Sequence, residues 1–144
     1  MKAQNYSNHR RFVIMYHVIS FFLIALLLVS SIYYTVSECN AHQSMKPGLF
    51  LFLISLIFLS LFFFARTFAL KAQDRAIRAE ENFRHYLLTG NPFDARLTIR
   101  QIIGLRFASD EEFPSLAKKA AEERISEDEI KKSIKNWRGD YYRV

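Results

Sequence analysis

The chain has 144 residues, of which 51% are hydrophobic and 15% aromatic, and its formal net charge is +6. A mean hydropathy of zero conceals two unlike halves, an apolar stretch at residues 12–70 and a strongly charged stretch at residues 71–144. Only about 75 residues remain for a soluble part, so a large soluble domain with an extensive core is excluded. Such a short piece is expected to lean on a membrane, on a neighbour or on itself.

Two apolar runs predict membrane-spanning helices. Residues 12–36 form a run of 25 without Asp, Glu, Lys or Arg, and residues 47–65 form a second uncharged run of 19. At roughly 1.5 Å of rise per residue, both runs are long enough to cross a hydrocarbon core of about 30 Å. A protein this small has no interior that could cover two such helices on all sides. We therefore predict transmembrane helices at residues 12–36 and 47–68.

A cleaved signal peptide is the alternative interpretation of the first run, because Arg10 and Arg11 precede it as a basic region would. The run exceeds the usual apolar region of about 7–15 residues, and no small-x-small cleavage site follows it. Cys39 resembles a lipoprotein cysteine only in position, since Val36 and Glu38 stand where such signals carry small residues. These features favour a retained helix.

Basic residues beside the two runs predict their orientation. Residues 1–11 contain three Lys or Arg, the connecting residues 37–48 contain one, and the twenty residues after the second run contain five. Because positively charged flanks stay on the cytoplasmic side, we expect residues 1–11 and 69–144 in the cytoplasm and the loop at 37–48 outside it. The expected location is a cell membrane, which the chain crosses more than once.

The basic flanks also predict a partner. Positive side chains next to a membrane attract anionic lipid headgroups, which we expect here rather than nucleic acid. The candidate lipid contacts are Arg10, Arg11, Arg66, Lys71, Arg75 and Arg78.

An alanine-rich periodicity follows the second run. Its members are spaced alternately by four and three residues, as along a helix-packing seam: Ala65, Ala69, Ala72, Ala76, Ala79, Phe83 and Tyr86. Small seam residues would let a second helix approach closely, from the same chain, a second copy or another protein. The alternative is that alanine occurs here only because it is the best helix former. Both interpretations predict one long helix that continues the second span.

Turn and capping signals divide the rest of the chain. Gly90 and Pro92 predict the end of the long helix. Three pairs have capping-box spacing, namely Thr98 with Gln101, Ser109 with Glu112, and Ser126 with Glu129. They predict short helices at about residues 99–107, 110–123 and 127–137. Pro114 falls inside the middle helix, where it could instead mark the first turn.

The residues that an enzyme or metal site needs are scattered. His9, His17, His42 and His85 fall on both sides of the predicted membrane, and no glycine-rich phosphate loop or nucleophile elbow is present. The single Cys39 cannot form an intrachain disulfide. We therefore expect no catalytic residues, no metal and no cofactor. His17 lies near the inner end of the first span, where an interfacial anchor is favoured over a role in a membrane pathway.

Several phrases resemble a family of small bacterial two-span membrane proteins. They are AQNYSNHRRFV, ALKAQDRAIRAEENFRHYLLTG, LTIRQIIGLRFASDEEFPSLAKKAAEE and IKKSIKNWRGDYYRV, and together they cover nearly the whole chain. The resemblance implies a bacterial inner-membrane protein. It brings no established activity, and so no functional residues are transferred.

The sequence thus predicts an all-α fold with a two-helix transmembrane hairpin, a long juxtamembrane helix and three short cytoplasmic helices. The expected function is that of a non-enzymatic membrane-anchored adaptor or assembly protein, which binds its own kind, another membrane protein or lipid. The alternative is an accessory subunit of a membrane transport complex.

Overall fold

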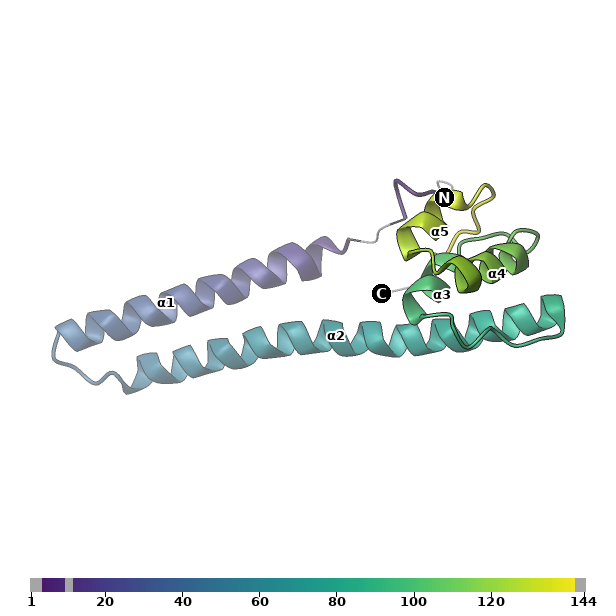
Figure 1. The fold of residues 1–144 in the computed structure, drawn as a ribbon. Coiled ribbons are helices and arrows are strands. Elements are labelled where there is room, and N and C mark those ends of the chain that lie inside the picture. The colour runs from purple at the N-terminus through teal and green to yellow at the C-terminus, as the bar shows by residue number, and fades with distance from the viewer. Residues whose placement is uncertain (1–3, 10–11, 142–144) are drawn as a thin grey trace. The chain divides into compact units, whose positions relative to one another are not determined.

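The computed structural model describes residues 4–9 and 12–141, which form helices and no β-strand (Figure 1). In chain order the elements are η1 (Met15–Ser20), α1 (Phe21–Asn40), α2 (Lys46–Thr89), α3 (Ile99–Leu105), α4 (Phe113–Glu123) and α5 (Glu127–Ser133). One isolated backbone bridge joins Ala108 and Trp137. The all-helical class predicted from the sequence is confirmed.

The chain divides into two compact units. Residues 11–68 form the first, here called the hairpin unit, and residues 1–10 together with 69–144 form the second, here called the helical domain. The division falls within α2, whose first part belongs to the hairpin unit and whose last part, from Ala69 to Thr89, belongs to the helical domain.

The hairpin unit packs at both of its ends through specific contacts. Near the connection, Gly48 lies so close to Thr35 that an added Cβ atom would stand 2.3 Å from the Thr35 Oγ1 atom. At the other end, the Tyr16 ring stacks on the Phe62 ring with 4.5 Å between centroids, and the Tyr16 hydroxyl donates to the Phe62 carbonyl. Ser31 and Ser55 are buried, and in the sequence each lies between the residues that make these two contacts. The helices are joined at residues 41–45, a shorter connection than the predicted 37–48.

The first helix begins with a π-helical turn, η1, which holds His17. The His17 ring stacks on Phe12 with centroids 4.6 Å apart, and its Nδ1 atom lies 2.9 Å from the Val13 carbonyl. These contacts occupy the imidazole locally. The anchoring role expected for His17 stays a prediction.

Helix α2 runs without interruption over 44 residues, as the alanine periodicity predicts. It ends where the sequence signals place its end. Gly90 has φ of 75°, the left-handed conformation that glycine adopts without a Cβ penalty, and its N–H donates to the Tyr86 carbonyl at 2.8 Å.

Two of the three predicted capping boxes are confirmed. Thr98 with Gln101 caps α3, and Ser126 with Glu129 caps α5, each through reciprocal side-chain and backbone hydrogen bonds. Pro114 lies in the first turn of α4, the position in which proline costs no hydrogen bond.

The third capping box, Ser109 with Glu112, was predicted wrongly. Helix α4 begins at Phe113 and has no side-chain cap. The physical reason is that the Glu112 carboxylate accepts hydrogen bonds from the backbone N–H groups of Lys135 and Asn136, at 3.0 and 2.8 Å. A long-range contact has therefore taken the side chain that local spacing assigned to the cap.

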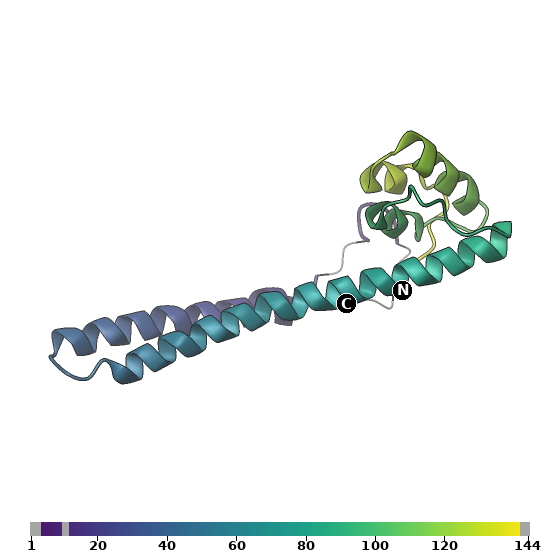
Figure 2. The same ribbon diagram turned by 60° about the horizontal axis from the view of Figure 1, so that its bottom comes forward.

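The helical domain has its own apolar core. Helices α3, α4 and α5 gather against one another in both ribbon views (Figures 1 and 2), and α2 contributes Ile77. The buried apolar residues are Ile77, Leu97, Ile102, Leu105, Phe107, Ala108, Phe113, Leu116, Ala117, Ala120, Ala121, Ile130 and Ile134. Their number means that this part of the chain does more than lean on a neighbour, because it encloses a small core of its own.

Candidate functional site: the polar contacts of the helical domain

The N-terminal residues dock on the C-terminal residues of the helical domain. We call residues 4–9 the N-terminal clasp. The Gln4 side chain pairs with the backbone of Asp140, donating from Nε2 to the carbonyl at 3.0 Å and accepting from the N–H at 2.8 Å. The Tyr6 hydroxyl donates to the Asp128 carboxylate at 2.5 Å. The clasp therefore joins the two ends of the described chain within one domain.

His9 anchors the clasp in the domain core. Its side chain is nearly buried, with ring centroids 5.7 Å from Phe107 and 5.8 Å from Trp137. The Nε2 atom lies 3.3 Å from the ammonium of Lys131, and the Nδ1 atom lies 2.7 Å from the Tyr6 carbonyl. Since an ammonium can only donate and a carbonyl can only accept, these contacts fit a neutral imidazole with its hydrogen on Nδ1.

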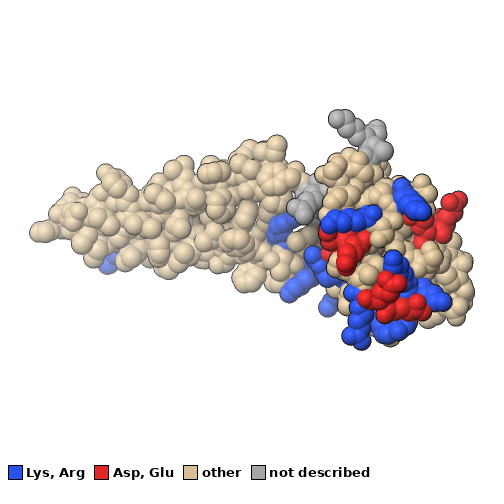
Figure 3. Space-filling model, turned by 45° about the horizontal axis from the view of Figure 1, so that its top comes forward, with Lys and Arg blue, Asp and Glu red and all other residues tan. Residues whose placement is uncertain are grey.

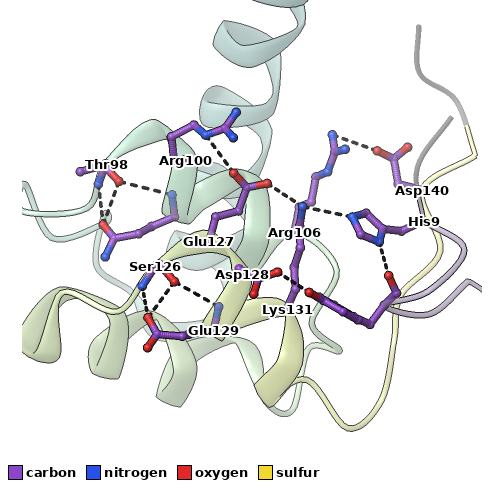
Figure 4. Close-up of polar contacts among 12 residues, drawn as sticks. His9, Thr98, Arg100, Arg106, Ser126, Glu127, Asp128, Glu129, Lys131 and Asp140 are labelled. Carbon is purple, nitrogen blue, oxygen red and sulfur yellow. Dashed lines mark hydrogen bonds and ion pairs between the residues drawn. The ribbon is translucent and has the colours of Figure 1, made fainter. Parts of the chain in front are cut away.

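The His9 contact is one end of a chain of polar side chains (Figure 4). The buried Lys131 ammonium also donates to the Glu127 carboxylate at 2.5 Å. The second oxygen of Glu127 accepts from Arg100 Nε at 2.9 Å. The chain thus extends from the clasp through α5 to α3, and the positive charge of Lys131 is offset where it is buried.

A second pair of charges lies beside the Tyr6 contact. Lys132 donates to Asp128 at 2.6 Å, and this hydrogen bond, together with the one from Tyr6, holds the pKa of Asp128 below its usual value. The same carboxylate raises the pKa of Lys132. Asp128 therefore stays ionised where the clasp meets α5.

Arg106 supports the clasp through an ion pair with the C-terminal segment. Its guanidinium lies 3.0 Å from the Asp140 carboxylate and 4.7 Å from the centroid of the Phe107 ring. Because the Asp140 backbone binds Gln4, this ion pair and the clasp fix the same stretch of chain.

Arg84 connects α2 to the rest of the helical domain. Its guanidinium donates to Glu81 at 3.0 Å, to Asp110 at 2.7 Å and to the Ala108 carbonyl at 2.8 Å. It also lies over the Phe113 ring, 4.2 Å from the centroid. Four contacts to one nearly buried side chain make Arg84 the polar centre of the α2 interface.

Glu81 lies in the same interface, where burial destabilises its ionised carboxylate. Only 7% of its surface is exposed, and burial raises the pKa of its carboxyl despite the hydrogen bond and charge of Arg84, which act in the opposite direction. Arg138 lies 3.9 Å from the second oxygen and adds a weaker opposing effect. A raised pKa here has a structural explanation, so it does not by itself indicate catalysis.

The predicted helix-packing seam is exposed in the described chain. Phe83 and Tyr86 have exposed fractions of 62% and 53%. Ala65, Ala72, Ala76 and Ala79 are exposed as well, and Ala69 is intermediate. The face that α2 turns to the domain core holds Ile77 and Glu81 instead. The seam is therefore not used inside the described chain, and whether another chain packs on it stays a prediction.

The candidate lipid contacts are placed only in part. Lys71, Arg75 and Arg78 are exposed on α2, and Arg66 lies 5.9 Å from the Tyr16 ring centroid. Arg10 and Arg11 lie outside the described residues. Lipid binding by this set stays a prediction.

The sequence did not predict the N-terminal clasp or the Arg84 contacts. Both join residues far apart in the chain, such as Gln4 with Asp140 and Arg84 with Asp110, and no periodicity or motif spacing carries that information. Among the described residues, no group of three or more His, Cys, Asp or Glu could hold a metal ion.

Chemically, the described polar groups hold the domain together. The buried charges of Arg84, Glu81 and Lys131 are bound by neighbouring side chains, and among the exposed carboxylates Asp128 pairs with Lys132 and Glu129 caps α5. The fold and these contacts define a two-part helical protein, with two long apolar helices and a compact charged domain.

Comparison with known families places the chain more narrowly. It belongs to a family of unknown function, DUF6526, whose model matches residues 1–144. No curated protein and no solved structure matches the chain.

Proposed function

We propose that this is a two-span integral membrane protein whose helical domain acts in the cytoplasm as a non-enzymatic adaptor or assembly module. One observation carries the proposal. The two helices that are long and apolar enough to cross a membrane are largely uncovered, with 6% and 11% of their most apolar windows buried. A core helix of a soluble protein would be mostly buried, so a bilayer is the environment that suits these surfaces.

The distribution of charge supports the same arrangement. On the face drawn in Figure 3, the hairpin unit presents almost no charged side chains, whereas Lys, Arg, Asp and Glu crowd the helical domain. Exposed side chains of the hairpin unit include Phe22, Leu26, Val29, Phe50 and Ile57. In water, exposed apolar residues over this length would cause aggregation. In a bilayer, lipid tails would solvate them.

Contacts within the hairpin unit also fit packing in a bilayer. Lipid tails are as apolar as leucine, so membrane helices pack through small residues and satisfied hydroxyls. Gly48 against Thr35 provides the close approach. The buried Ser31 and Ser55 hydroxyls donate to carbonyls of their own helices, at 2.7 Å each.

The N-terminal clasp supports an even number of crossings. Residues 4–9 and residues 69–141 form one domain, so they share one side of any membrane that the intervening residues cross. Lys71, Arg75 and Arg78 follow the second apolar stretch, and the positive-inside rule assigns that side to the cytoplasm of a bacterial cell. Anionic headgroups are the proposed partners of Lys71 and Arg78.

An adaptor is favoured over an enzyme because the buried polar groups of the helical domain stabilise its own fold. Arg84 and Lys131 each hold a neighbouring helix or segment through several contacts. What remains for other molecules is the surface, with a charged part and the exposed apolar face of α2.

Affinity purification in mild detergent tests this proposal with matched variants. Arg84→Ala removes the polar centre of the α2 interface, whereas Arg78→Ala removes an exposed arginine of the same helix. An adaptor should lose its co-purifying proteins in Arg84→Ala and keep them in Arg78→Ala. An accessory transport subunit, which would bind through its hairpin, should keep permease chains in both variants, and that result would contradict the adaptor.

A further inference from the structure

An apolar face of α2 stays exposed on the outside of the helical domain. It is formed by Ala69, Ala72, Ala76, Ala79, Phe83, Tyr86 and Leu87, and we call it the α2 face. Its large members have exposed fractions of 62% at Phe83, 53% at Tyr86 and 68% at Leu87. Such large apolar side chains, close together on a charged domain, indicate an interaction surface.

The domain does not obstruct this face. The buried residues of the same helix segment, Ile77 and Glu81, lie about 100° to 160° around the helix from Ala76 and Ala79, at about 100° per residue. The segment between α3 and α4 packs on that buried side, where Arg84 contacts Ala108 and Asp110, and Ile77 belongs to the domain core. A second helix can therefore approach the α2 face without displacing the domain.

The spacing of the α2 face is that of a two-stranded coiled coil. Ala69, Ala76 and Phe83 occupy the first core position of successive heptads, and Ala72, Ala79 and Tyr86 occupy the second core position. In this register, Arg75 takes the flanking position g and Glu80 takes the following position e. These are the two positions that meet between parallel helices.

Charge complementarity identifies the occupant. In a parallel pair of identical helices, Arg75 of each copy faces Glu80 of the other, which gives two opposite-charge contacts related by the twofold axis. Both side chains are exposed, and neither has an ion-pair partner in the described part of the chain. The alanines let the axes approach, and Phe83 and Tyr86 close the far end.

We propose that the protein forms a parallel homodimer in which the α2 faces of two copies pack against each other, with Arg75 of each copy paired with Glu80 of the other. The proposal rests on the membrane insertion proposed above, because two copies inserted in the same orientation hold their α2 helices parallel. It extends that proposal by naming the partner as a second copy of this chain.

Disulfide crosslinking of the full chain in native membranes tests the dimer. The exposed Cys39 is first replaced by serine, and single cysteines are then introduced as Ala76→Cys, Ala79→Cys and, as the matched control, Arg78→Cys. Core positions of a parallel dimer face their own counterparts, so Ala76→Cys and Ala79→Cys should crosslink as dimers and Arg78→Cys should not. Equal crosslinking at all three positions, no crosslinking at Ala76→Cys, or a disulfide to a different protein would overturn the proposal.

A charge-swap series separates the parallel register from other arrangements. In the Ala76→Cys background, Arg75→Glu and Glu80→Arg each create two like-charge contacts, and each should raise the amount of protein needed for half-maximal crosslinking about fivefold. The double variant restores opposite charges and should recover the original value. If the double variant crosslinks as poorly as the single variants, Arg75 and Glu80 do not face each other.

Carbonate extraction of the same membranes distinguishes the failure of this inference from the failure of the proposed function. Protein that resists extraction but does not crosslink is inserted and does not pair through the α2 face. Protein that carbonate releases is not integral, and that result contradicts the membrane proposal itself.

Discussion

Glu81 is a buried carboxylate, and burial and Arg84 change its pKa in opposite directions. Arg84 donates to it at 3.0 Å, but burial has the larger effect and raises its pKa. An acid whose pKa is higher in the folded protein than in the unfolded chain binds protons more tightly when folded. The stability that Glu81 gains from this tighter proton binding is therefore fully present below the ordinary glutamate pKa of 4.5. It is lost as pH rises through the raised pKa.

Glu81→Gln should remove this dependence on pH. The amide oxygen can still accept from Arg84, but it carries no charge to desolvate. The free energy of unfolding of the wild type, minus that of Glu81→Gln, should decrease as pH rises above 4.5. Chemical denaturation of the full chain in detergent over a pH series measures the difference. A difference that rises over the same range would mean that the Arg84 ion pair outweighs burial.

At the same scale, the residues that sequence reasoning identified correctly are those with local partners. Thr98 binds Gln101 and Ser126 binds Glu129, three residues away, and Gly90 adopts the conformation that its position in the helix requires. Glu112 had the same local signal but binds Lys135 and Asn136. His9, Tyr6 and Arg84 likewise bind distant residues, which a single sequence does not identify.

Among the elements, α4 ends on a residue that is poorly suited to its conformation. Arg124 follows the helix with φ of 53° and ψ of 33°, a left-handed conformation in which a Cβ atom costs about 1 kcal/mol or more. Arg124→Gly should therefore stabilise the helical domain by about 0.5 to 1 kcal/mol, as measured by denaturation of the full chain. Arg124→Ala is the matched control and should show no such gain. An equal gain in both variants would point to the lost charge instead.

The start of α2 depends on a close approach between helices. A Cβ atom at Gly48 would stand 2.9 Å from the Thr35 Cα atom, which is backbone and cannot rotate away. Gly48→Ala should therefore lower the stability of the hairpin unit by about 1 to 3 kcal/mol, although alanine favours helix more than glycine does.

Thermal unfolding in detergent measures the effect, with Leu49→Ala as the control. Leu49 is the neighbouring residue and is half exposed, so its truncation should change the midpoint much less. A stabilised Gly48→Ala protein would show that helix propensity decides this position and that the contact with Thr35 does not.

The two long helices were predictable because their signal is local and strong. Uninterrupted apolar runs locate α1 and α2, and the alanine periodicity extends α2 beyond the apolar run. The ends of the connection, at residues 41–45, were less predictable because Ser37 to Asn40 are polar yet still helical, with the Ala41 N–H donating to the Ser37 carbonyl at 3.0 Å. Polarity marks the end of an apolar surface, and the helix itself continues for one more turn.

For the whole molecule, the proposed arrangement unites the uncovered hairpin unit with the clasped helical domain. The clasp requires residues 4–9 to lie on the same side as residues 69–141. In the proposed arrangement, the two apolar helices between them cross the membrane and return the chain to the side from which it entered. The clasp and the two crossings therefore make the same prediction about the side of the membrane on which each segment lies.

Labelling with a membrane-impermeant maleimide tests that property most directly. Single cysteines at Ser7, Gln43 and Ser133, all exposed positions, are introduced after Cys39 is replaced by serine. In intact cells Gln43→Cys should be labelled, while Ser7→Cys and Ser133→Cys should be labelled only after the membrane is opened. Labelling of Ser7→Cys and Ser133→Cys on opposite sides, or protection of Gln43→Cys in intact cells, would contradict the two-span arrangement with a cytoplasmic helical domain.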